Sequence, residues 1–181
     1  LGTTNSAIVR MESGEPKIKK TDTLKDTMPS CVYFNKKKSI LVGDPAYNSL
    51  KADKLKSMKK PEEQKTNAFI EFKRTMGSDK SYFSSHMDKG YSSEELSAEI
   101  LRTLKSFVTD ESIHSAIVTV PAKFTSNQKD ATLRAASLAG FSHCELLQEP
   151  IAAAMAYGLT SSNTDGCLLV FDFGGGFAEA I

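Results

Sequence analysis

The chain has 181 residues, of which 40% are hydrophobic, and a formal net charge of +1. This length and composition suit one sizeable folded domain, or one domain with a small insertion. The near-neutral charge argues against a nucleic-acid partner, and no apolar run approaches the roughly 20 residues of a membrane span. We therefore expect no nucleic acid and no membrane among its partners.

Three cysteines, Cys31, Cys144 and Cys167, are scattered along the chain and form no C-x-x-C pair. This spacing argues against a zinc ribbon and against a dithiol redox motif. Free thiols fit a reducing compartment, so we expect a cytoplasmic protein.

The chain opens on a small, hydroxyl-rich turn, L-G-T-T-N-S at residues 1–6. A strand is expected to follow from Ala7 to Met11, as one arm of a β-hairpin whose turn lies at Ser13–Pro16. Backbone N–H groups and threonine hydroxyls in such a turn can hold phosphate oxygens and Mg²⁺-bound waters. An ordinary β-turn is the alternative.

We interpret residues 35–95 as an insertion, an α+β subdomain attached to the main body. Within it, residues 48–66 are polar, rich in lysine and weakly patterned. Lysine clusters at 17–20, 36–38 and 59–60 favour a solvated surface. A basic patch for an acidic partner is the alternative.

The second half alternates between strand and helix patterns, which predicts an α/β domain with a mixed or parallel sheet. Capping boxes at Ser92 and Thr125 predict two helix starts, and Gly140 is placed to cap the second helix at its C-terminus. The expected elements are a helix from 92 to about 108, a strand over 116–120, a helix over 125–139, a strand over 144–147 and a helix over 150–157.

An apolar strand over 167–171 delivers Asp172, and three glycines follow, Gly174, Gly175 and Gly176. Glycines let backbone N–H groups approach a phosphate closely, and a carboxylate beside them can orient a Mg²⁺-bound water. A tight turn without a ligand is the alternative. The sequence contains no G-x-x-x-x-G-K-[ST] motif, which excludes a Walker-type phosphate loop.

Four motifs in order carry a family resemblance: L-G-T-T-N-S at 1–6, T-V-P-A-K-F at 119–124, E-P-I-A-A-A-M-A-Y-G-L at 149–159 and F-D-F-G-G-G at 171–176. Together they resemble the ATPase domain of the 70-kDa heat-shock chaperone family. The resemblance implies an α/β, actin-like (ribonuclease H-like) ATPase fold with ATP between two lobes. It implies a first-lobe core at 1–34 and 96–164, an inserted α+β subdomain at 35–95 and the start of the second lobe at 165–181.

The resemblance also implies site residues and the cofactors ATP/ADP and Mg²⁺. Lys73, which by sequence alone is one exposed lysine among many, matches the lysine that reaches the transferring phosphate. Glu149 and Asp172 match carboxylates that act through Mg²⁺-bound waters. Pro121 and Lys129 match an interlobe switch. The matched phosphate-loop residues are Gly2, Thr3, Thr4 and Asn5 in the first loop and Gly174, Gly175 and Gly176 in the second.

Three departures from the family pattern stand out. Lys129 occupies a position where the family often has arginine, and lysine cannot form the planar bidentate fork. Phe177 follows Gly176 where the family has threonine, which removes a hydroxyl from the second phosphate loop. Because the sequence reaches only the opening of the second lobe, we expect the isolated 181-residue chain to bind ATP weakly and to be inactive.

The resemblance implies a chaperone in which ATP hydrolysis drives a peptide-binding domain. Its partners would be unfolded client polypeptides, a J-domain cochaperone and a nucleotide exchange factor. Two alternatives remain at this point: a sugar or acetate kinase of the same fold superfamily, and a non-hydrolysing relative that serves as a regulatory module.

Overall fold

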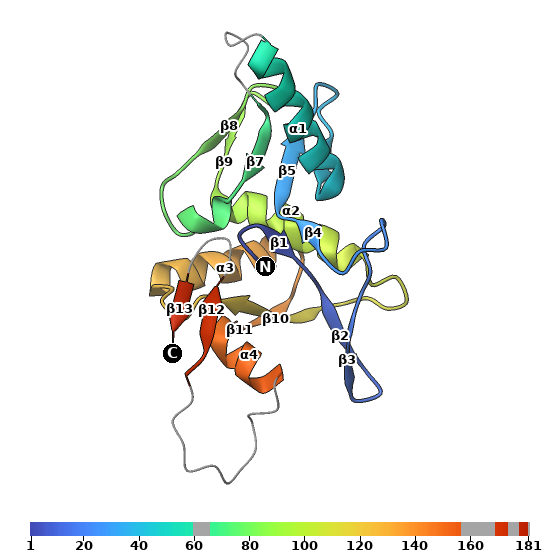
Figure 1. The fold of residues 1–181 in the computed structure, drawn as a ribbon, viewed down its shortest axis with the longest axis vertical. Helices are drawn as coiled ribbons and strands as arrows, with labels where there is room; N and C mark the ends of the chain where they lie inside the picture. Colours follow the sequence, from blue (N-terminus) through green and yellow to red (C-terminus); the bar gives the residue numbers. More distant parts are fainter. Residues whose placement is uncertain (60–65, 157–168, 174–177, 181) are drawn as a thin grey trace.

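The computed structural model describes residues 1–59, 66–156, 169–173 and 178–180. They form a mixed α/β structure in which helix α2 (Ser93–Ser106) crosses the middle of the molecule (Figure 1). We call residues 31–91 the upper part and residues 1–18 with 107–156 the lower part. None of the described helices is both long and apolar enough to cross a membrane.

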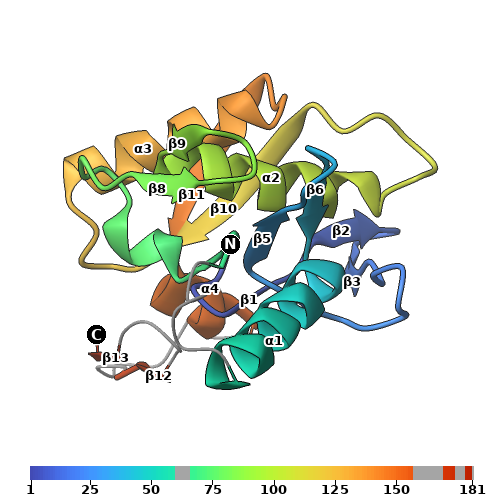
Figure 2. The same cartoon turned by 90° about the horizontal axis from the view of Figure 1, so that it is seen from above.

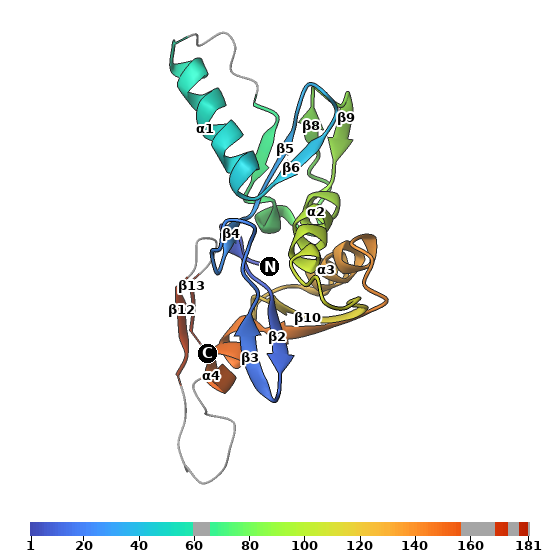
Figure 3. The same cartoon turned by 90° about the vertical axis from the view of Figure 1, so that its right-hand side faces the viewer.

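The upper part is built on strand β5 (Cys31–Phe34), which pairs antiparallel with β6 (Ile40–Val42) on one side and β7 (Ala68–Ile70) on the other. Successive side chains of β5 point to opposite faces. Cys31 packs in a cluster with helix α1 (Asp44–Lys59), and Val32 and Phe34 pack in a second cluster with α2. Figure 3 shows α1 covering one face of this sheet.

Helix α1 was not recognised in the weak pattern of residues 48–66. Only Ala46 and Leu50 of this helix are buried, so its sequence carries almost none of the i, i+4 periodicity that marks an amphipathic helix. The upper part is completed by the hairpin β8 (Tyr82–Ser84) and β9 (Lys89–Tyr91) and by the short 3₁₀ helix η2 (Phe72–Thr75).

In the lower part, strand β10 (Ser115–Val120) pairs parallel with β11 (His143–Gln148), as the β-α-β pattern predicts. Helix α3 (Ser126–Leu138) connects them and packs with α2 on one face of the pair, and α4 (Glu149–Ala156) lies on the other face (Figure 2).

Both predicted capping boxes in these helices are present. Ser92 caps α2 and Thr125 caps α3. In each case the hydroxyl of the cap accepts from the backbone N–H of the third helical residue, and the side chain of that residue accepts from the backbone N–H of the cap. Gly140 follows α3 with φ 85°, the left-handed conformation that favours glycine after a helix.

The N-terminal residues form short strands. Strand β1 (Asn5–Ser6) pairs with β4 (Met28–Pro29), and β2 (Val9–Glu12) forms a hairpin with β3 (Glu15–Ile18). The strand predicted from Ala7 begins at Val9, and the hairpin turn consists of Ser13 and Gly14, which both have positive φ. This is the backbone that a two-residue hairpin turn requires.

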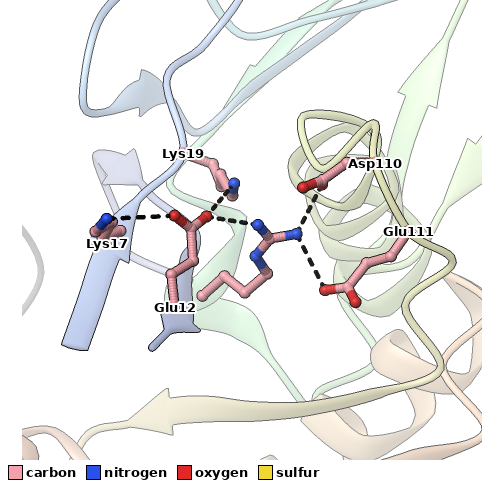
Figure 4. Close-up of polar contacts among 6 residues, drawn as sticks. Glu12, Lys17, Lys19, Asp110 and Glu111 are labelled. Carbon is pink, nitrogen blue, oxygen red and sulfur yellow. Dashed lines mark hydrogen bonds and ion pairs between the residues drawn. The ribbon is translucent and has the colours of Figure 1, made fainter. Parts of the chain in front are cut away.

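An ion-pair cluster ties this hairpin to the loop after α2 (Figure 4). Arg10 donates to Asp110 Oδ1 at 2.7 Å, to Glu111 Oε1 at 3.2 Å and to Glu12 Oε1 at 2.6 Å. Glu12 also bonds Lys19. The cluster therefore joins residues about 100 positions apart in the sequence.

The C-terminal described strands, β12 (Phe171–Phe173) and β13 (Ala178–Ala180), pair antiparallel. The prediction of a buried strand over 167–171 is wrong for Leu169 and Val170, which precede the strand, and Leu169 is 73% exposed. A two-stranded ribbon has too few neighbours to bury its flanking residues. Residues 167 and 168 lie outside the described residues.

Candidate functional site

An ion pair between a buried lysine and a partly buried glutamate marks the candidate site. Lys73 lies in η2 with only 4% of its side chain exposed, and its Nζ donates to Glu149 Oε1 at 2.5 Å. Glu149 is the first residue of α4, where the helix dipole favours a carboxylate. The expectation of an exposed Lys73 is wrong, because tertiary packing encloses this turn between the two parts of the molecule.

The turn that carries Lys73 is anchored on both sides. Phe72 is buried in the cluster that contains α2 residues, and Met76 is buried in a separate cluster with Val120 and Phe124. Glu71, before the turn, has φ 57° and Gly77, after it, has φ 71°. Two neighbouring hydrophobic anchors with Lys73 between them leave its ammonium little freedom to leave the site.

Phe124 forms one wall of the site. Its ring is buried, and the Lys73 Nζ lies 5.7 Å from the ring centroid, within the range of a cation–π contact. The sequence motif T-V-P-A-K-F includes Phe124, but no role was predicted for this residue. The signal that could have found it is its place shortly after strand β10, which ends at Val120.

The first predicted phosphate turn reaches the same site. Leu1 packs against the cluster that contains Met76, Val120 and Phe124, and its backbone nitrogen lies close enough to Lys73 and Glu149 to interact with their charges. The start of the turn therefore lies beside the Lys73–Glu149 pair. A Cβ added to Gly2 would lie 2.0 Å from the Asn5 carbonyl oxygen, so only glycine fits this turn.

Two serines that the sequence analysis did not select hold this turn in place. Gly2 N donates to Ser6 Oγ at 3.1 Å, and Ser30 Oγ donates to the Gly2 carbonyl at 2.7 Å. The two serine hydroxyls are 2.8 Å apart, and Ser30 N donates to the Thr4 carbonyl. Thr3 is buried, whereas Thr4 and Asn5 are exposed. The pairing of β1 with β4 brings the serines together, a long-range contact that no local pattern encodes.

The predicted switch residues lie on one continuous segment. Pro121 is buried at the end of β10, and its carbonyl accepts from Phe124 N at 3.1 Å. Lys129 lies in the first turns of α3 and is half-buried, and its backbone N donates to the Thr125 carbonyl. Phe124 connects this segment with Lys73, so the structure brings the switch region next to the ion pair.

Asp172 lies in the middle of β12, opposite Glu179 of β13. Strand β12 contacts α4, the helix that begins at Glu149. Gly174, Gly175, Gly176 and Phe177 lie outside the described residues, so the geometry of the second predicted phosphate loop cannot be included in the site.

The residues around Lys73 fit a phosphate group better than a directly bound metal ion. Within the described ranges, no group of three or more histidine, cysteine, aspartate or glutamate residues could hold a metal. Mg²⁺ bound with phosphate usually keeps several waters and uses one or two carboxylates. Glu149 offers such a carboxylate. The turn at residues 1–6 and the Lys73 ammonium offer donors for phosphate oxygens.

Comparisons with known proteins give a consistent result. The chain matches the model of the "Hsp70 protein" family over residues 1–180. It is 38% identical to the chaperone protein DnaK of Nitrosopumilus maritimus and 37% identical to that of Methanothermobacter thermautotrophicus, each over 97% of this chain. It is also 37% identical to the DnaK of Mesomycoplasma hyopneumoniae. The chain spans only 27–28% of the length of these relatives.

Proposed function

This chain belongs to the Hsp70 protein family, and from that premise we propose that it is the first part of the nucleotide-binding domain of a molecular chaperone. ATP binding and hydrolysis in the full-length protein would drive a peptide-binding domain in protein folding. The observation that carries the proposal is the Lys73–Glu149 ion pair, with its buried lysine, beside the turn at residues 1–6. Membership of this family favours the chaperone over the sugar or acetate kinase alternative.

We propose the domain division expected for this fold. Residues 1–34 and 96–164 form the α/β core of the first lobe, residues 35–95 form the inserted subdomain, and residues 165–181 open the second lobe. Strands β6 and β7 and the α1-covered cluster support the inserted unit, although the central strand of their sheet, β5, lies just before its proposed start at residue 35. The β12–β13 hairpin supports the start of the second lobe.

The proposed cofactors are ATP/ADP and Mg²⁺, which when bound would supply the phosphoryl group and a charge-neutralising cation. Thr3 and the backbone N–H groups of the turn at residues 1–6 would hold phosphate oxygens. Lys73 would direct its ammonium at the oxygens where negative charge develops, and Glu149 would keep that ammonium oriented. Asp172 and Glu149 together would hold Mg²⁺-bound waters.

Lys73 has no strong alternative role as a structural residue. A buried lysine whose stabilising partner is one carboxylate contributes little net stability, because desolvation of the two charges offsets their attraction. The pair is therefore better explained by chemistry at this position than by folding. Phe124 and the segment from Pro121 to Lys129 then connect the site to the switch that would report the nucleotide state.

We propose unfolded client polypeptides, a J-domain cochaperone and a nucleotide exchange factor as partners of the full-length protein. A cytoplasmic location is proposed from the described cysteines, since Cys31 and Cys144 are both free thiols. Burial raises the pKa of the Cys31 thiol to about 12, which keeps this group protonated and unreactive.

The decisive experiment is ATP turnover by the full-length protein with Lys73→Ala. We expect turnover to fall by about 100-fold or more, because removing one preorganised charge at the transferring phosphate has an effect of this order. Lys56→Ala, which removes an exposed lysine of α1, is the matched control and should leave turnover unchanged. Wild-type turnover in Lys73→Ala would remove Lys73 from the mechanism. Absence of turnover in the wild type would support the non-hydrolysing alternative, and phosphoryl transfer to a sugar or acetate would support a kinase.

A further inference from the structure

The side chain of Thr75 lies at the end of the same 3₁₀ turn that carries Lys73, and it makes three polar contacts. Its Oγ1 donates to the Phe72 carbonyl at 3.1 Å, and it lies 2.7 Å from Tyr82 Oη and 2.8 Å from Ser93 Oγ. A threonine hydroxyl has one proton and two acceptor lone pairs. Since a carbonyl can only accept, Tyr82 and Ser93 must both donate to Thr75, which saturates the hydroxyl.

These contacts join three separate elements at one atom. Phe72 and Thr75 belong to η2, Tyr82 belongs to β8, and Ser93 is the first residue of α2 and is fully buried. The ring of Tyr82 also packs edge-on against Phe69 of β7, with ring centroids 5.7 Å apart. The Thr75 hydroxyl therefore attaches the turn to the hairpin of the upper part and to the central helix.

Hydrophobic packing fixes the ends of the turn but does not fix its rotation. Phe72 and Met76 lie in different clusters, so apolar contacts anchor the turn at each of its two ends. The hydrogen bonds of Thr75 to β8 and α2 set the rotation of a turn anchored in this way, because hydrogen bonds are directional and apolar contacts are not. The rotation of η2 in turn sets the direction in which Lys73 reaches Glu149.

We propose that Thr75 is a positioning residue for Lys73, acting through the hydroxyl junction with Tyr82 and Ser93. This inference rests on the proposed function, in which Lys73 acts at the transferring phosphate. Thr75 touches neither Glu149 nor a predicted phosphate loop among its described contacts, so its effect on the reaction passes through the orientation of the turn.

The test compares Thr75→Val, which keeps the shape and removes the hydroxyl, with Thr75→Ser, which keeps the hydroxyl. In single-turnover ATP hydrolysis by the full-length protein, we expect Thr75→Val to lower the rate constant about 10-fold, since small displacements of a catalytic group have effects of this size or larger. The ATP concentration at half-maximal rate should change less than about twofold. Thr75→Ser should restore the rate to within about twofold of wild type.

Thr132→Val is the matched control for loss of a threonine hydroxyl. Thr132 is buried in α3, and its Oγ1 donates to the Gln128 carbonyl of the same helix at 2.8 Å. A second readout is independent of turnover: the rate at which an amine-reactive reagent labels Lys73, followed by mass spectrometry. Labelling should become faster in Thr75→Val and remain at the wild-type rate in Thr132→Val.

Parallel measurement of Lys73→Ala separates the two proposals. Normal turnover in Lys73→Ala would remove the proposed role of Lys73 at the transferring phosphate, whatever Thr75 does. Loss of turnover in Lys73→Ala with a wild-type rate in Thr75→Val would remove the positioning role alone, and so would an equal loss in Thr75→Val and Thr132→Val. If Thr75→Val does not fold, Tyr82→Phe removes one donor of the junction and decides the question by the same two readouts.

Discussion

Strand β5 in the upper part has a paired neighbour on each side and a hydrophobic cluster on each face. Strand β10 in the lower part pairs on one side only, with β11, among the strands that the structure describes. Its other side faces the hairpin strand β2 across a groove of roughly 580 Å³. The apolar side chains Val9, Met11 and Ile117 are 51%, 62% and 66% exposed there.

Both parts of the molecule contribute to the candidate site, but in different ways. The upper part buries both faces of β5, one of them against α2, and presents Lys73 on a turn with two buried anchors. The lower part contributes Glu149, Phe124 and the segment from Pro121 to Lys129. Its β2–β3 hairpin is held by ion pairs to the loop between α2 and β10, at Asp110 and Glu111, rather than by strand pairing with β10. We therefore expect mutations in the core of the upper part to lower the free energy of unfolding more than matched mutations on the surface of the molecule or in the β2–β3 hairpin of the lower part.

Phe34→Ala tests the closed core most directly. Phe34 is fully buried, and its ring stacks on Tyr91 with centroids 4.2 Å apart. Removal of this ring should destabilise the protein by about 3–5 kcal/mol, through lost burial and the cavity that remains. Urea denaturation followed by circular dichroism measures the loss. Phe83→Ala, which removes a 60% exposed ring from β8, is the matched control and should change stability by less than about 0.5 kcal/mol.

Gly77→Ala tests the junction between the two parts. Gly77 has φ 71°, and a Cβ added there would lie 2.7 Å from the Asn127 carbonyl oxygen at the start of α3. Backbone must move to accept the methyl group, so we expect a loss of about 1–3 kcal/mol. The matched control is Gly14→Ala in the β2–β3 turn, where φ is 84° but no atom lies within 4 Å. Equal losses in the two variants would show that positive φ alone, and not the contact with α3, sets the cost.

Local signals predicted the helices and strands between residues 92 and 156 well. The capping boxes at Ser92 and Thr125 and the glycine at Gly140 encode helix ends by short-range hydrogen bonds and backbone conformation, and all three are present. The parallel pairing of β10 with β11 followed from the β-α-β order. Helix α1 was missed because it buries only two residues and leaves little periodicity to detect.

The candidate site was predictable only in part. The family resemblance selected Lys73 and Glu149, which lie 76 positions apart, and the structure places them in contact. The burial of Lys73, its contact with Phe124 and the junction at Thr75 depend on tertiary packing, which single residues do not reveal. Hydroxyl groups such as those of Ser30 and Thr75 look alike in a sequence, and only the partners that the fold brings to them distinguish a structural hydroxyl from an exposed one.

The smallest expected effect concerns the ion pairs that hold the β2–β3 hairpin. Hydrogen bonds from Lys19 and then Arg10 hold the pKa of Glu12 at about 2, below its ordinary value of 4.5. Because the folded-state pKa is lowered, the ionised carboxylate stabilises the fold fully above about pH 4.5, and this contribution is lost as the pH falls towards 2. The Arg10 guanidinium also lowers the pKa of Asp110, so both groups lose their contribution in the acid range.

Urea midpoints measured from neutral pH down to about pH 2 should therefore fall for the wild type and fall less steeply for Glu12→Gln. Exposed ion pairs are weak and screened, so about 1 M salt, where the Debye length is about 3 Å, should reduce the difference between the two proteins. An identical pH dependence in wild type and Glu12→Gln at low salt would mean that the ion pairs do not hold the hairpin. The open side of β10 would then depend on the packing of Leu101, Leu104 and Phe141 in the groove, and the contrast between the two parts would be one of apolar contact alone.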